Sequence, residues 1–80
     1  MDLTGFEAYR GYFYRVSANY SPAGEWRGTI DIRKRRSDGT VEPLVSNKDV
    51  LGGFPSEALA REAADAYARV VIDGEKFSDA

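Results

Sequence analysis

Residues 26–35 read WRGTIDIRKR, the clearest strand pattern in the chain. Apolar or small residues alternate with polar residues along it, which is the pattern of a strand with one buried face. The face expected to point inward carries Trp26, Gly28, Ile30 and Ile32. The face expected to point outward carries Arg27, Thr29, Asp31, Arg33 and Arg35.

Residues 12–20 show the same two-residue period and are predicted to form a strand before this one. The set expected to point inward is Tyr12, Tyr14, Val16, Ala18 and Tyr20. Phe13 is an apolar exception on the opposite face, which otherwise carries Arg15, Ser17 and Asn19. Residues 21–24 contain proline and glycine, which favour turn dihedrals, and are predicted to join the two strands.

A third, shorter strand is predicted at residues 40–45, after the turn signal Asp38-Gly39. Pro43 has no N–H to donate, so this strand is expected at the edge of the sheet, with residues 26–35 in the middle. Residues 46–55 carry polar residues and paired glycines, and are predicted to form a loop.

A helix is predicted from Ser56, a good N-cap, to about Asp73, where Gly74 provides a stop. The apolar stripe expected to face the sheet is Ala60, Ala63, Ala64, Tyr67, Val70 and Val71. Charges of alternating sign recur every fourth residue, which predicts a solvated face formed by Glu57, Arg61, Asp65, Arg69 and Asp73.

Together these elements predict an α+β fold with the element order βββα. A three-stranded antiparallel β-meander is packed on one face by a single C-terminal α-helix. The 80 residues are enough for one domain, covering residues 1–80. Residues 1–8 are expected to be a loose lead-in from which Leu3 and Phe6 can dock, and residues 75–80 a frayed tail.

The composition argues against an enzyme. The chain has no cysteine and no histidine, so thiolate chemistry and the commonest metal ligand and proton shuttle are missing. Neither GxxxxGK[ST] nor GxGxxG occurs, so no cofactor is expected. Without cysteine or histidine ligands, no metal is expected either. The first residues do not resemble a signal peptide and no apolar run could span a bilayer, so we expect a cytoplasmic protein without a membrane partner.

The net charge of −2 hides an asymmetry along the chain. Residues 9–36 carry seven cationic and two anionic side chains, whereas residues 37–80 carry four and nine. Much of the positive charge falls on the outward strand positions, on the sheet face that one helix leaves uncovered. The candidate binding face is therefore formed by Arg15, Arg27, Arg33, Arg35, Phe13 and Asn19.

Three interpretations of this face stay open. The leading hypothesis is a non-enzymatic interaction module whose open sheet face or edge strand binds a protein partner or a second copy of the chain. The alternative is a nucleic-acid-binding domain, because arginine contacts phosphate in a bidentate manner and stacks on bases. The third is that these arginines only keep the domain soluble, and a sequence pI of about 5.0 argues against a dedicated nucleic-acid binder.

Two resemblances accompany these patterns. The chain resembles small bacterial proteins of unknown function built from a β-meander and a helix, through Tyr9-Arg10-Gly11, Trp26, Ile30-Asp31-Ile32-Arg33, Gly53-Phe54-Pro55-Ser56-Glu57-Ala58 and Ala63-Ala64-Asp65-Ala66-Tyr67-Ala68. It is also similar to the AP2 and integrase-type ββα DNA-binding domains, through Tyr9-Arg10-Gly11, Trp26, Ile32-Arg33, Leu51-Gly52-Gly53-Phe54 and Glu62-Ala63-Ala64-Asp65-Ala66-Tyr67. The first resemblance implies no function, and the second implies binding of nucleic acid.

Overall fold

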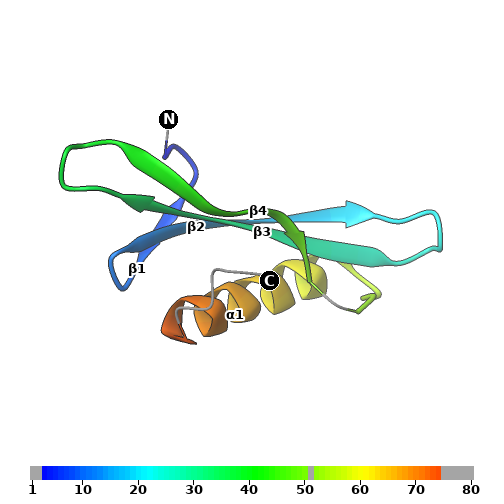
Figure 1. Cartoon of the computed structure of the whole chain (residues 1–80). Helices are drawn as coiled ribbons and strands as arrows, with labels where there is room; N and C mark the ends of the chain where they lie inside the picture. Colours follow the sequence, from blue (N-terminus) through cyan, green and yellow to red (C-terminus); the bar gives the residue numbers. More distant parts are fainter. Residues whose placement is uncertain (1–2, 51, 75–80) are drawn as a thin grey trace.

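The structure is a computed structural model that describes residues 3–50 and 52–74. One antiparallel sheet with strand order β1-β2-β3-β4 is packed on one face by a single helix (Figure 1). The domain is elongated, with extents of 44 × 25 × 19 Å, because the β2–β3 and β3–β4 hairpins extend beyond opposite ends of the helix. The elements are β1 (Glu7–Tyr9), β2 (Tyr12–Tyr20), β3 (Trp26–Arg35), β4 (Val41–Asp49) and α1 (Glu57–Gly74).

The prediction of an antiparallel sheet with one C-terminal helix is confirmed, but the prediction of three strands is wrong, because the sheet has four. The additional strand, β1, includes residues assigned to the loose lead-in at 1–8. It pairs with β2 through a two-residue turn in which Arg10 has φ 51° and Gly11 has φ 85°. Positive φ at both positions defines the tight hairpin turn that suits strand twist. Arginine is unusual there, and three strand residues are too few to show an alternation.

β4 is longer than predicted and includes residues 46–49, which were assigned to a loop. Its pairing with β3 shifts register twice between Ile30 and Arg33, so β4 carries extra residues there, as in β-bulges. Asn47 has φ 48°, a left-handed backbone conformation. The bulge breaks the two-residue period on which the sequence prediction relied.

The predicted turns and helix cap are present. Gly24 has φ 87° and donates its N–H to Ser21, and Gly39 has φ 90° and donates to Arg36. Ser56 caps α1, since its Oγ accepts the N–H of Leu59 at 3.2 Å. Among the residues that the structure describes, no helix is both long and apolar enough to span a membrane.

The core lies between the sheet and α1. Ile30 and Ile32 are fully buried there, which confirms the predicted phase of the central strand. From the opposite side the helix contributes small side chains together with Val71 and Ile72. Val70, however, was predicted to face the core and is 65% exposed, so that part of the helical phase is wrong. The other buried apolar residues are Tyr14, Val45, Val50, Ala60, Ala64 and Ala68.

The helix approaches the sheet most closely at Gly28. A Cβ built on Gly28 would lie 2.8 Å from the carbonyl oxygen of Ala60 and 3.0 Å from the Cβ of Ala64. The first of these contacts is with helix backbone, which cannot rotate away. The helix can therefore pack this closely against the sheet only because the strand has a glycine and the helix has alanines at the contact.

We expect Gly28→Ala to lower the free energy of unfolding by about 1–3 kcal/mol, because the added methyl group forces the helix away from the sheet. Thr29→Ala, on the opposite face of the same strand, is the control and should cost less than about 1 kcal/mol. Urea unfolding followed by the fluorescence of Trp26, the single tryptophan, measures both. An equal loss in the two variants contradicts the packing argument.

Candidate functional site

The six residues of the candidate binding face lie on the sheet face turned away from α1. Cross-strand pairing brings Phe13 opposite Arg33, Arg15 opposite Asp31 and Asn19 opposite Arg27. Arg35 lies two residues beyond Arg33 on β3 and therefore on the same face. The sequence-predicted residues thus share one face, spread along the full length of the β2–β3 ladder.

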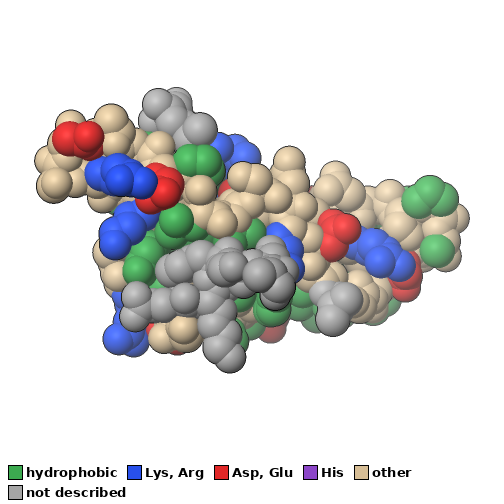
Figure 2. Space-filling model, viewed as in Figure 1, with side chains coloured by type: hydrophobic (Ala, Val, Ile, Leu, Met, Phe, Trp, Pro, Cys, Tyr) green, Lys and Arg blue, Asp and Glu red, His purple; other side chains and the backbone are tan. Residues whose placement is uncertain are grey.

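Arg15 and Arg27 on this face are each paired with a carboxylate. Arg27 Nη2 lies 2.8 Å from Glu25 Oε1, and Arg15 Nη2 lies 3.5 Å from Asp31 Oδ2. In the view of Figure 2, Lys and Arg side chains lie beside Asp and Glu side chains at both ends of the molecule. The positive charge of the outward strand positions is thus partly neutralised within the domain.

Phe6 docks on this face against Arg15 and Arg33, as the sequence led us to expect. Its ring lies 4.3 Å from the guanidinium carbon of Arg33 and 4.9 Å from that of Arg15. Both distances lie within the range of cation–π attraction. The chain before β1 therefore lies on the side of the sheet away from α1 (Figure 1).

Phe13 and Arg35 form a further guanidinium–ring contact, nearer the β3–β4 turn. The guanidinium carbon of Arg35 lies 5.6 Å from the centre of the Phe13 ring. Arg35 is exposed, and no carboxylate among residues 3–50 and 52–74 is paired with it.

Asp31 is a buried carboxylate on this outward face, with an exposure of only 6%. Its Oδ1 accepts the backbone N–H of Asn47 at 3.0 Å, and its Oδ2 faces Arg15. The first bond satisfies an N–H that the bulge in β4 removes from the ladder. Asp31 therefore fixes the local shape of the edge strand and holds Arg15 in place.

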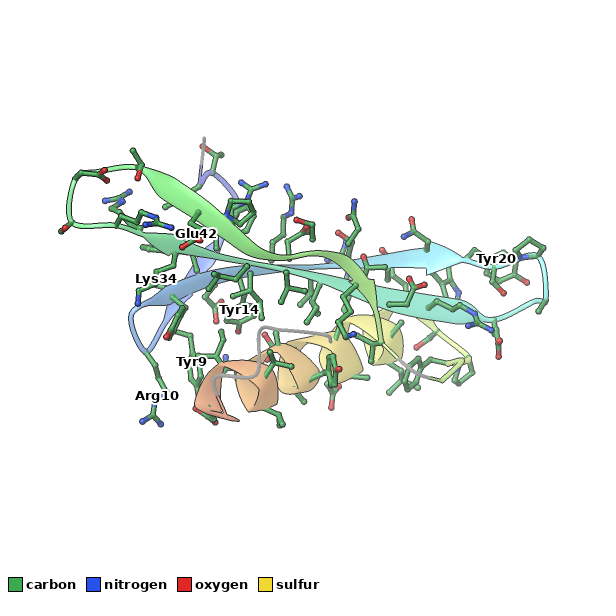
Figure 3. The ribbon with its side chains drawn as sticks, viewed as in Figure 1. Tyr9, Arg10, Tyr14, Tyr20, Lys34 and Glu42 are labelled. Atoms are coloured by element: carbon green, nitrogen blue, oxygen red, sulfur yellow. The ribbon has the colours of Figure 1, made fainter. Side chains whose placement is uncertain are left out.

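A second polar cluster joins the sheet to α1 on the helix side, where Figure 3 shows Tyr14 pointing toward the helix. The Tyr14 hydroxyl lies 2.5 Å from Asp65 Oδ1 and 2.8 Å from Glu7 Oε2, and it accepts from Arg69 Nε at 3.1 Å. Arg69 also contacts both carboxylates, at 3.1 Å and 3.2 Å. Asp65 and Arg69 lie on the helix face that was predicted to be solvated, and their side chains stay 39% and 44% exposed, but both also bond to the sheet.

Burial, followed by its hydrogen bonds to Asp65 and Glu7, raises the pKa of the Tyr14 hydroxyl well above its usual range. The hydrogen bond from Arg69 opposes this change only in part. The phenol is therefore held in its neutral form as a donor, and the cluster serves as a fixed link between β1, β2 and α1.

Next to this cluster, Tyr9 donates to Asp73 at 3.0 Å, and Arg10 forms an ion pair with the same carboxylate at 3.3 Å. A cavity of about 240 Å³ opens between Arg10, Tyr12, Ile72 and Asp73. Figure 3 shows Tyr9 and Arg10 extending from the β1–β2 turn beside the end of the helix. These contacts hold the β1–β2 turn against the last turn of α1.

A further hollow of about 280 Å³ lies on the side of α1 and is mainly apolar. The sequence analysis did not predict this hollow, because it assigned Ala63 to the stripe facing the sheet. The signal that could have revealed it is a second apolar stripe, with the spacing of Leu59, Ala63, Ala66 and Val70. The residues lining this hollow are Phe54, Leu59, Glu62, Ala63 and Ala66.

Within the described part of the chain, no group of three or more histidine, cysteine, aspartate or glutamate side chains is placed to hold a metal ion. No family model, curated protein or solved structure matches this chain. The two family resemblances therefore stay predictions.

We expect Asp31→Ala to lower the free energy of unfolding by about 1–3 kcal/mol, because it leaves the Asn47 N–H and Arg15 without their acceptor. Asp31→Asn keeps an oxygen for the Asn47 N–H and should cost less. Hydrogen exchange of the Asn47 amide should accelerate most in Asp31→Ala. The control is Asp49→Ala, which removes an exposed carboxylate from β4, the edge strand that carries Asn47. If it lowers the free energy of unfolding as much as Asp31→Ala does, Asp31 has no special role.

We expect the stability of the domain to fall as the pH rises above about 10, the ordinary pKa of tyrosine. In that range the unfolded Tyr14 ionises while the folded one stays protonated, so the unfolded state binds fewer protons and is favoured. Tyr14→Phe should remove this part of the pH dependence, which amounts to at most about 1.4 kcal/mol per pH unit. Urea titrations on both sides of pH 10 measure it, and equal slopes in the two proteins contradict it.

Proposed function

We propose that this chain is a non-enzymatic interaction module that binds a short acidic segment of a protein partner. The binding surface is the part of the outward sheet face nearest the β3–β4 turn, formed by Phe13, Arg33 and Arg35. A chain without cysteine suits a reducing compartment, and a cytoplasmic location is part of the proposal.

The observation that carries the proposal is the exposed guanidinium of Arg35 over the ring of Phe13, without a carboxylate partner in the described chain. A guanidinium that rests on an aromatic ring keeps its planar fork of donors in a restricted orientation. Such a fork matches the two oxygens of a carboxylate in a bidentate contact. Arg33, placed against Phe6 on the same strand, extends the cationic surface toward the middle of the sheet.

The sheet face is favoured over the edge strand, and an acidic peptide over nucleic acid. Pro43 and two bulges interrupt the hydrogen-bonding edge of β4, which makes it a poor template for an added strand. Arg15 and Arg27 are already paired with carboxylates, which interrupts the cationic surface and argues against a continuous track for phosphates. The net charge of −2 also opposes attraction of a polyanion at long range.

The test is an NMR titration of the ¹⁵N-labelled chain at low salt. The probes are a peptide of about eight residues rich in Asp and Glu, a single-stranded DNA and a duplex DNA. We expect the peptide to shift the resonances of Phe13, Arg33 and Arg35, and Arg35→Gln to weaken its binding about tenfold, the loss of one charge-assisted contact. Arg36→Gln removes the same charge from an arginine that is already paired with Glu42, and should leave the affinity unchanged.

Three results would overturn the proposal. Stronger binding of DNA, with an affinity that falls steeply with salt, would favour the nucleic-acid alternative. Equal effects of Arg35→Gln and Arg36→Gln would show that only net charge matters. No resonance shift with any probe at millimolar concentration would leave the arginines as solubilising side chains.

A further inference from the structure

The helix carries a second apolar stripe on the side that does not face the sheet. Leu59, Ala63, Ala66 and Val70 follow at spacings of four, three and four residues, which is the spacing of the seam in a helix pair. Leu59 is 45% exposed and Val70 is 65% exposed. Exposed branched side chains in this register do not contribute to the core of the domain and need another explanation.

This stripe combines a projection and a hollow. Val70 projects near one end, and the cavity of about 280 Å³ lies toward the other end, between Phe54, Leu59 and Ala66. When two copies of one surface meet across a two-fold axis, each presents to the other what it carries itself. A surface with a projection at one end and a hollow at the other is therefore complementary to an antiparallel copy of itself.

We propose that a second copy of this chain docks on this stripe, with the two α1 helices antiparallel. In that arrangement Val70 of each copy lies against Leu59 of the other, beside the hollow. Ala63 of each copy lies against Ala66 of the other, and these small side chains let the helix axes approach closely. This contact uses a different surface from the arginine-bearing sheet face, so it neither requires nor excludes the proposed function.

The charges along the stripe select the antiparallel orientation. Glu62 and Arg69 lie on the same flank of the stripe, seven residues apart. In an antiparallel pair the same flanks meet, so Glu62 of each copy faces Arg69 of the other, whereas a parallel pair places Glu62 opposite Tyr67. Arg69 is held in position by Tyr14, Asp65 and Glu7, while its Nη1 has no hydrogen-bond partner in the described part of the chain.

The contact is small, because one helix face and Phe54 make up the whole surface. Its area falls at the lower end of protein–protein interfaces, where association is weak and transient. We therefore expect a monomer–dimer equilibrium with a dissociation constant on the order of 10–100 µM rather than a permanent dimer.

Sedimentation velocity of the full chain from about 10 µM to about 1 mM tests the proposal around that expected constant. We expect the sedimentation coefficient to rise with concentration, and Val70→Ser and Glu62→Lys each to weaken the dimer about tenfold or more. Tyr20→Ser removes an apolar side chain that is 63% exposed at the far end of the domain, and should have no effect. Asp49→Lys makes the same charge change as Glu62→Lys on the edge strand and should also have no effect.

The orientation is tested by oxidising a mixture of the Ala63→Cys and Ala66→Cys variants, since the chain has no cysteine of its own. An antiparallel pair predicts mainly the mixed disulfide between the two variants, because only that pair brings the two β-carbons within bonding reach. Mainly like-with-like disulfides would overturn the orientation. A monomer at about 1 mM, or a dimer that Val70→Ser and Glu62→Lys leave unchanged, would overturn the surface.

Discussion

The whole structure depends on the contact between the backbone of Gly28 and the helix at Ala60 and Ala64. Because no side chain separates the two layers at this point, α1 lies directly against β3. Ile30 and Ile32 are fully buried between them. A chain of 80 residues buries a smaller share of its surface than a larger protein. Its stability therefore relies on close packing along one helix, which covers one face of the sheet.

Much of the fold follows from patterns within single segments. The alternation in residues 26–35 predicted which face of the central strand is buried, and Asp38-Gly39 and Ser56 marked a turn and a helix start. β1 gave no such signal, because it is three residues long and its turn places Arg10 at positive φ. Residues 46–49 join β4 because a distant carboxylate, Asp31, accepts the displaced N–H of Asn47.

The candidate site was predictable in its position but not in its electrostatics. The alternation of side chains along the strands placed Phe13, Arg33 and Arg35 on one face. The carboxylates that pair with the other arginines depend on the fold: Glu25 pairs with Arg27, and the buried Asp31 pairs with Arg15. In the same way, a charge repeat on the helix predicts a solvated face. It cannot reveal that Tyr14, more than fifty residues earlier in the chain, bonds to Asp65 and Arg69.

The irregular edge of the sheet has a consequence for the behaviour of the chain at high concentration. Regular, flat strand edges are where proteins add further strands and grow into amyloid fibres. Here β4 presents Pro43, two bulges and a left-handed Asn47 along its edge of the sheet. The carboxylate of Asp31, by holding the bulge in shape, thus also protects the chain against fibril growth from that edge.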